Sequence, residues 1–154
     1  MRNREHLRRL DRVWIRGPVF LVTGCAKERR RVLAPRPLTG DVLECLAEAR
    51  YYHNWMVGGY VVMPDHVHFF CTPRERDWNL SDFVGRFNSR STRAGWQHGI
   101  KGALWQQDFH DHLLRSNESY SRKWTYVQRN PVRAGLCGEM HDWPWVGEMD
   151  QFRS

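Results

Sequence analysis

Three observations predict an α+β fold in which helices cover one face of an antiparallel sheet. Two β-rich apolar runs, residues 55–63 and 66–71, are separated only by Pro64-Asp65, which indicates two strands joined by a tight turn. Segments with helical spacing of apolar residues flank this hairpin, at 38–53 and after residue 79. The length of 154 residues is that of one domain with a single core.

The segment before the hairpin contributes a strand and a helix. Residues 18–26 (PVFLVTGCA) form a compact apolar run typical of a strand, and the basic loop KERRR follows at 27–31. Residues 38–53 predict a helix. Its apolar side chains recur in helical register at Val42, Leu43, Leu46 and Ala49.

The segment after the hairpin begins with a polar loop and a second helix. Asn79 or Ser81 can cap this helix, which we expect to continue to about Ala94. Residues 102–115 (GALWQQDFHDHLLR) then indicate a strand with a bulged or polar middle.

A last helix completes the predicted domain, which takes in residues 1–154. Ser116 opens it, and Pro131 and Gly135 close it. The predicted order is therefore β-α-β-β-α-β-α. Its first six elements have the order of a ferredoxin-like sandwich, and the seventh is an additional C-terminal helix.

The charge of the chain favours an anionic partner. Lys+Arg 24 against Asp+Glu 17 gives a net charge of +7 and a pI near 9.7, and nucleic acid is the commonest anionic partner at this size. The eight Trp can stack on unpaired bases, although burial in the core is the ordinary role of each. Residues 1–16 hold six Arg and form a basic N-terminal arm, which is either a short helix or a solvated tail.

Cysteine usage and hydropathy exclude several other classes. The four cysteines are widely scattered with no C-x-x-C pair, which argues against a zinc ribbon or a disulfide framework. No apolar run reaches the length of a membrane span, and the N-terminus lacks the core of a signal peptide. We expect a cytoplasmic protein with no membrane partner.

Two histidines stand in the apolar run GYVVMPDHVHFF at residues 59–70. Residues i and i+2 of a strand point to the same face, so His66 and His68 present two imidazoles side by side. Buried imidazoles need partners, and a divalent cation satisfies both at once. A second pair, His110 and His112, stands among polar residues where water can satisfy it, so we expect that pair to be incidental.

The last predicted helix offers a further pair of functional groups. Tyr126 and Asn130 are four residues apart, so they share one face of a continuous helix. Asn supplies a carbonyl oxygen that a metal can bind, and Tyr supplies a hydroxyl that can act as a nucleophile. Taken alone, this helix is better explained by a packing role for Tyr126 and a helix-ending role for Asn130 before Pro131.

The two segments together resemble a known family. MPDHVHFF is similar to the histidine–hydrophobic–histidine motif of the HUH endonucleases, and RKWTYVQRNPVRAGL resembles the catalytic-helix signature of single-tyrosine transposases. The similarity is strongest to the REP-associated tyrosine transposases, and it extends from about residue 17 to 146. The H-x-H pattern alone is unspecific, whereas its combination with Y-x-x-x-N followed by PVRAGL is specific.

The resemblance implies a site and a reaction. His66, His68 and Asn130 would hold one divalent metal, Mg²⁺ or Mn²⁺, although two imidazoles also suit zinc. Tyr126 would attack a scissile phosphate of single-stranded DNA, giving a 5′-phosphotyrosine link at hairpins formed by palindromic repeats. Phosphate contacts are expected from basic side chains, namely Arg29, Arg30, Arg31, Arg122 and Arg133. For Arg122 and Arg133 an ordinary place on a solvated helix flank is the alternative.

Two functions from different classes remain open. The first is a single-stranded DNA nicking and joining enzyme. The second is a non-catalytic module that holds single-stranded nucleic acid on a ferredoxin-like sheet. Only the first explains the histidine pair, the tyrosine and the asparagine together. The resemblance leaves a monomer and a homodimer equally open.

Overall fold

A computed structural model describes residues 11–14, 17–115 and 119–153 of the chain. The central feature is a five-stranded sheet with the order β5-β2-β4-β3-β6, in which every neighbouring pair is antiparallel. Its strands are β2 (Phe20–Cys25), β3 (Trp55–Val62), β4 (His66–Pro73), β5 (His110–Leu113) and β6 (Val146–Glu148). Four of them, β5-β2-β4-β3, lie in the strand order of a ferredoxin-like sandwich, which confirms the predicted fold class.

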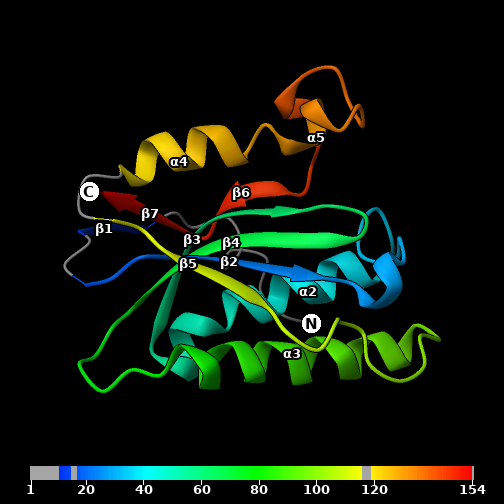
Figure 1. The fold of residues 1–154 in the computed structure, drawn as a ribbon, viewed down its shortest axis with the longest axis horizontal. Helices are drawn as coiled ribbons and strands as arrows, with labels where there is room; N and C mark the ends of the chain where they lie inside the picture. Colours follow the sequence, from blue (N-terminus) through cyan, green and yellow to red (C-terminus); the bar gives the residue numbers. More distant parts are fainter. Residues whose placement is uncertain (1–10, 15–16, 116–118, 154) are drawn as a thin grey trace.

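Two helices cover one face of this sheet (Figure 1). They are α2 (Leu38–Ala47), which continues into a π-helical turn at Ala49–His53, and α3 (Leu80–Gln97). The main core lies between them and the sheet, because Val67, Phe69 and Cys71 of β4 pack here with residues of α2 and α3. Asn79 caps α3, since its side-chain oxygen accepts a hydrogen bond from the Asp82 backbone N–H at 3.1 Å.

The other face of the sheet carries α4 (Tyr120–Val127), with the short helix α5 (Asn130–Arg133) after it (Figure 1). Tyr120, Trp124 and Val127 of α4 share a face and pack with Phe70 of β4. Phe70 meets Tyr120 edge-on, with ring centroids 4.9 Å apart. A second, smaller core therefore lies on this side of the sheet.

A glycine pair in β3 allows α4 to approach the sheet. The ladder to β4 shifts register between Val57 and Tyr60, which marks a bulge at Gly58-Gly59. A Cβ on Gly59 would lie 2.5 Å from the Trp124 ring, and one on Gly58 would lie 2.7 Å from the Tyr120 hydroxyl. Since real Cβ contacts are never so short, these two positions require glycine if α4 is to sit where it does.

The predicted single helix from Ser116 to Asn130 is wrong. Residues 116–118 lie outside the described residues, α4 ends at Val127, and α5 begins at Asn130 after a turn at Gln128-Arg129. Pro131 explains the break, because it has no N–H to donate to the Val127 carbonyl and its ring clashes with that carbonyl in a continuous helix. Pro131 instead occupies the first turn of α5, where a missing N–H costs nothing.

The predicted strand over 102–115 is too long. Only His110–Leu113 pair with β2, together with an isolated bridge between Ala26 and Trp105. Leu104 and Trp105 are buried in the core, and of the two Trp105 forms the single bridge to Ala26. The Phe109 ring lies over Gly24, where a Cβ would be only 2.3 Å away.

The C-terminal segment contributes strands that the sequence pattern did not indicate. β6 pairs with β3 at the edge of the sheet. β7 (Asp150–Arg153) pairs in parallel with β1 (Asp11–Trp14) as a separate two-stranded sheet. The helical alternative for the N-terminal arm is thus wrong over Asp11–Trp14, and residues 1–10 and 15–16 lie outside the described part.

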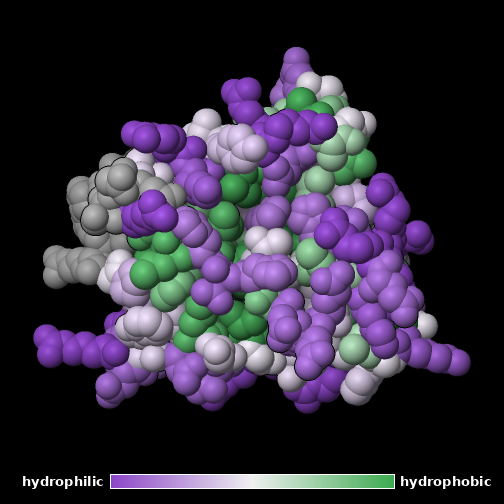
Figure 2. All heavy atoms as spheres, in the orientation of Figure 1, coloured by the Kyte–Doolittle hydropathy of each residue, from purple (hydrophilic) through white to green (hydrophobic). Residues whose placement is uncertain are grey.

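The surface is mixed in polarity. Figure 2 shows a mainly hydrophilic side of the molecule, with hydrophobic residues gathered left of centre. No helix in the described ranges combines the length and the apolar composition that a membrane crossing requires.

Candidate active site

The histidine pair lies on the face of the sheet that α4 covers. Along β4, Val67, Phe69 and Cys71 belong to the core beneath α2 and α3, whereas Phe70 packs with α4. Because side chains alternate along a strand, His66 and His68 share the face of Phe70. Their rings are 4.9 Å apart between centroids and nearly perpendicular. The predicted same-face arrangement is what the strand adopts.

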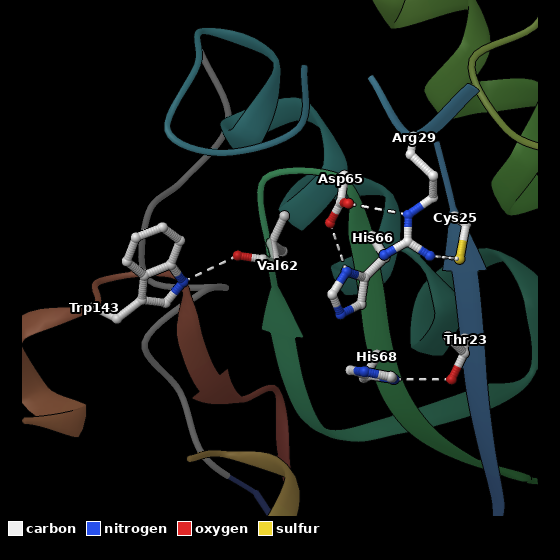
Figure 3. Close-up of polar contacts among 8 residues, drawn as sticks. All are labelled: Thr23, Cys25, Arg29, Val62, Asp65, His66, His68 and Trp143. Carbon is white, nitrogen blue, oxygen red and sulfur yellow. Dashed lines mark hydrogen bonds and ion pairs between the residues drawn. The ribbon is translucent and has the colours of Figure 1, made fainter. Parts of the chain in front are cut away.

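Each imidazole is oriented by an oxygen on its Nδ1 atom (Figure 3). Asp65 Oδ1 lies 2.8 Å from His66 Nδ1, and Thr23 Oγ1 lies 2.8 Å from His68 Nδ1. The Asp65 carboxylate only accepts, so it favours the His66 tautomer whose Nε2 lone pair is free to bind a metal. The Thr23 hydroxyl can donate to His68 Nδ1 or accept from it, so it orients this ring without fixing its tautomer. A carboxylate behind a metal-binding histidine also raises its basicity. The two rings therefore fit a divalent cation through their Nε2 atoms.

Asp65 is a residue of this candidate site that sequence reasoning missed, since Pro64-Asp65 was interpreted only as a turn. Its second oxygen, Oδ2, accepts a hydrogen bond from Arg29 Nε at 3.0 Å. Arg29 also places Nη1 3.2 Å from Cys25 Sγ (Figure 3). The signal that would have found Asp65 is its position next to the first histidine, where a carboxylate can reach the ring.

The basic loop lies beside this site. Arg29 is tied to Asp65, and Arg30 donates from Nη2 to the Ala103 carbonyl at 2.8 Å. Arg31 is exposed. The first two side chains are thus anchored to the protein, and a phosphate would have to share them with these partners.

Electrostatics keep His68 neutral. Burial, together with the nearby charges of His66 and Arg133, lowers its pKa from the ordinary 6.5 to about 4. At neutral pH the ring is therefore a base with an available lone pair, as metal binding requires. The interaction with Arg133 also shows that α5 lies close to the histidines.

Arg133 connects the tyrosine and the asparagine. Its guanidinium lies over the Tyr126 ring, 4.0 Å from the ring centroid. Nη1 donates to the Tyr126 carbonyl oxygen at 2.8 Å, and Nη2 donates to Asn130 Oδ1. Tyr126 and Asn130 do not lie on one continuous helix as predicted, because the helix breaks between them. The same arginine instead binds both across the break.

The tyrosines of α4 differ in exposure. Tyr126 has 62% of its surface exposed, so its hydroxyl can reach a substrate. Tyr120 is buried, its hydroxyl accepts a hydrogen bond from the Gly59 N–H at 2.7 Å, and burial raises its pKa far above the ordinary 10. Tyr126 is therefore the tyrosine of α4 that can act as a nucleophile.

The remaining predicted residues lie at the periphery. Arg122 is exposed on α4. His110 and His112 are exposed on the edge strand β5, where His110 is the cross-strand neighbour of Thr23. The second histidine pair thus flanks the site from two strands away.

A second group of metal-binding side chains lies elsewhere. Glu139, His141 and Asp142 come within 4.8 Å of one another, but all three are exposed. His141 pairs with both carboxylates, at 3.2 and 3.4 Å. Mutual pairing explains this cluster without an ion.

Fold and site together define a class of protein. The chain belongs to the family described as "Transposase IS200 like", which matches residues 20–130, and hence to a family of DNA-binding transposases. More particularly, it is similar to the REP-associated tyrosine transposase of Escherichia coli (strain K12). The two are 25% identical over 134 residues, which cover 87% of this chain and 78% of the relative.

A solved structure supports the fold. It is that of the REP-associated tyrosine transposase bound to a REP hairpin, and it matches with a TM-score of 0.72 at 24% identity. The match covers 90% of this chain and 81% of that one. The resemblance to this group, first carried by the histidine and tyrosine motifs, is thus confirmed.

Proposed function

We propose that this protein is a metal-dependent endonuclease and strand transferase that cuts single-stranded DNA at hairpins formed by palindromic repeats. One observation carries the proposal. Two histidines oriented through Nδ1 share a face of the sheet with the helix that exposes Tyr126. A binding module has no need for this combination.

His66 and His68 would hold the metal through Nε2, and Asn130 would add its carbonyl oxygen. A bound Mg²⁺ or Mn²⁺ would supply positive charge that polarises the scissile phosphate. Zinc also suits two imidazoles. Asn130 Oδ1 already accepts from Arg133, but an amide oxygen has two lone pairs and can serve both partners.

Tyr126 would form the covalent intermediate. Its hydroxyl oxygen attacks phosphorus, the new bond links tyrosine to the 5′ phosphate of the strand downstream of the break, and the bond from phosphorus to the 3′ oxygen of the upstream strand breaks. The phenol loses its proton, and the departing 3′ oxygen gains one. Because the phosphotyrosine retains the energy of the original bond, a 3′-OH can reverse the step without ATP.

Arg133 would position this nucleophile. Its stacking on the Tyr126 ring and its bond to the Tyr126 carbonyl fix the end of α4, while its bond to Asn130 fixes the start of α5. A planar guanidinium can make all of these contacts at once. Arg122, Arg30 and Arg31 are candidates for contacts to DNA phosphates, which the net charge of +7 favours.

The proposed substrate is based on the DNA bound by a structural relative. A REP-associated tyrosine transposase has been solved bound to a REP hairpin. A similar hairpin, from palindromic repeats with single-stranded flanks, is the substrate we propose here.

The test compares Tyr126→Phe with the intact protein on labelled hairpins. We expect the intact protein with Mn²⁺ to form an adduct that survives denaturant and retains a 3′ label, while a 5′ label stays on free DNA. Tyr126→Phe should bind the hairpin without cutting it. Replacing His66 or His68 with Ala should abolish cutting, whereas His110→Ala and His112→Ala should retain most of it.

Other outcomes have clear meanings. If the intact protein bound the hairpin but did not cut it with Mg²⁺, Mn²⁺ or zinc, the function would be that of a non-catalytic binding module. Cutting by Tyr126→Phe would indicate a nuclease that uses water. Full cutting in a chelator would exclude a metal.

A further inference from the structure

The outer side of α3, on the face of the sheet opposite to Tyr126, carries a hollow with an unusual lining. Its floor is made of small residues one helical turn apart, and its rim is basic. The floor residues are Ser81, Gly85 and Ser89, and the rim residues are Arg86, Arg90 and Arg93. We call this hollow the α3 groove. Small side chains along its floor leave room for another chain to lie against the helix.

A second hollow adjoins the α3 groove and has exposed aromatic side chains. It includes Tyr52 and Trp78, and it shares His53, Asp82 and Arg86 with the α3 groove. Tyr52 is 66% exposed and Trp78 is 42% exposed. The two hollows therefore form one continuous path with aromatic groups at one end and arginines at the other.

The arginines at the basic end differ in their partners. Arg90 donates to Glu48 at 2.7 Å, so its charge is largely neutralised. Arg86 lies 3.4 Å from His53 Nδ1, and Arg93 donates to the Ser89 carbonyl of its own helix. In the described part of the chain, neither Arg86 nor Arg93 pairs with a carboxylate. They are seven residues apart on one helix face, about 10 Å along the axis, and Arg93 also lines a neighbouring hollow that contains Asp41, Glu44 and Glu48.

The aromatic end suits bases better than phosphates. Trp78 is held edge-on against Phe20 and Trp55, at centroid distances of 5.5 and 6.1 Å, so its ring is fixed while part of it stays open. Glu75 and Asp77 line this end, and their charges would repel a phosphate. Carboxylates do accept hydrogen bonds from the amino groups of bases, and aromatic rings stack on unpaired bases.

We propose that this path binds single-stranded DNA, with bases at Tyr52 and Trp78 and phosphates at Arg86 and Arg93. A duplex is excluded as the preferred ligand, because stacked base pairs offer no free faces to the aromatic rings. The inference rests on the proposed function in one respect, namely that the DNA is the single-stranded flank of the hairpin. Cutting leaves one strand without a covalent link to Tyr126, and a remote groove would retain that strand for rejoining.

The experiment measures binding of two hairpins that carry equal numbers of phosphates. One has a single-stranded tail of twelve nucleotides, and the other has the same added phosphates as a longer paired stem. The variants are Arg86→Gln/Arg93→Gln and Tyr52→Ala. The matched control is Arg36→Gln/Lys101→Gln, which removes two exposed charges.

We expect Arg86→Gln/Arg93→Gln to weaken binding of the tailed hairpin by tenfold or more. The log–log salt slope should fall by about 1.4, or about 0.7 for each lost phosphate contact. Tyr52→Ala should weaken the tailed hairpin with little change in slope, because stacking carries no charge. Binding of the stem-extended hairpin, and the behaviour of the control, should be unchanged.

Equal weakening for both hairpins, or none for either, would overturn the proposal. Preference for the longer stem would assign the groove to duplex DNA instead. Failure of the proposed function would give a different result. The covalent adduct at Tyr126 would be missing, while the stronger binding of the tailed hairpin could still be measured.

Discussion

The glycine at position 59 should control the placement of the nucleophile from the opposite side of α4. In Gly59→Ala the added Cβ would lie 2.5 Å from the Trp124 ring, whereas ordinary contacts begin near 3.4 Å, so the ring must move by about 1 Å. Trp124 is buried and also meets Phe70, so the movement is passed to α4. Overpacking of this kind costs about 1–3 kcal/mol.

The effect on activity should exceed the effect on stability. Tyr126 is two residues beyond Trp124 on the same helix. A displacement of about 1 Å at a reacting group can reduce a rate by roughly a hundredfold. We therefore expect Gly59→Ala to lower the single-turnover cutting rate by about that factor while hairpin affinity changes little.

The assay combines urea unfolding with the rate of adduct formation. Gly40→Ala is the matched control, because a Cβ there meets nothing within 4 Å, and alanine in a helix should raise stability by about 0.5–1 kcal/mol. Trp124→Phe in the Gly59→Ala background should restore part of the rate by making space. A Gly59→Ala protein that cuts at the normal rate would refute the idea that contact between α4 and β3 places Tyr126.

Three further predictions concern the histidine face. Burial and nearby charges lower the pKa of His68 to about 4 in the folded protein. Between about pH 6.5 and 4 the unfolded chain therefore binds a proton at this residue, whereas the folded chain does not. The free energy of unfolding of the metal-free protein should therefore fall as pH drops from about 6.5 to 4, by up to about 3 kcal/mol. Urea titrations with chelator check this, and a His68→Gln protein with the same loss would contradict it. Asp65→Asn should weaken Mn²⁺ binding by about 10–100-fold by calorimetry, since the carboxylate behind His66 is lost; unchanged affinity would remove Asp65 from the site. Arg133→Lys should slow cutting by about tenfold or more at unchanged hairpin affinity, because an ammonium cannot make both hydrogen bonds and stack. If affinity fell and the rate held, Arg133 would be a DNA contact only.

The parts of the fold that sequence predicted are those with strong local periodicity. The hairpin around Pro64-Asp65 and the two helices on one face follow from apolar spacing, which burial of one face enforces. The same-face geometry of His66 and His68 follows from the strand period alone.

The parts that were missed depend on contacts between distant segments. β6 and β7 are three and four residues long, and they form because β3 and β1 provide partners more than eighty residues away in the chain. Residues 102–109 resemble a strand by composition, but they form only one isolated bridge, and Trp105 and Phe109 pack against Phe87. Local pattern carries no signal for such choices.

The site was predicted in its residue types more fully than in its connections. The spacing of Tyr126 and Asn130 suggested one helix face, yet Pro131 breaks the helix, and Arg133 joins the two residues by a route that spacing does not show. The roles of Asp65 and Thr23 depend on side-chain geometry across the sheet, so only the structure could assign them.

The residue that becomes bound to DNA distinguishes the proposed enzyme most directly from its alternatives. Proteolysis of the denatured adduct, followed by mass spectrometry of the peptide that retains the nucleotide, identifies that residue directly. We predict a single modified peptide carrying a 5′-phosphodeoxynucleotide on Tyr126. Modification of Tyr120 or of any other residue, or free DNA ends with no modified peptide, would contradict the assignment of Tyr126 as the nucleophile.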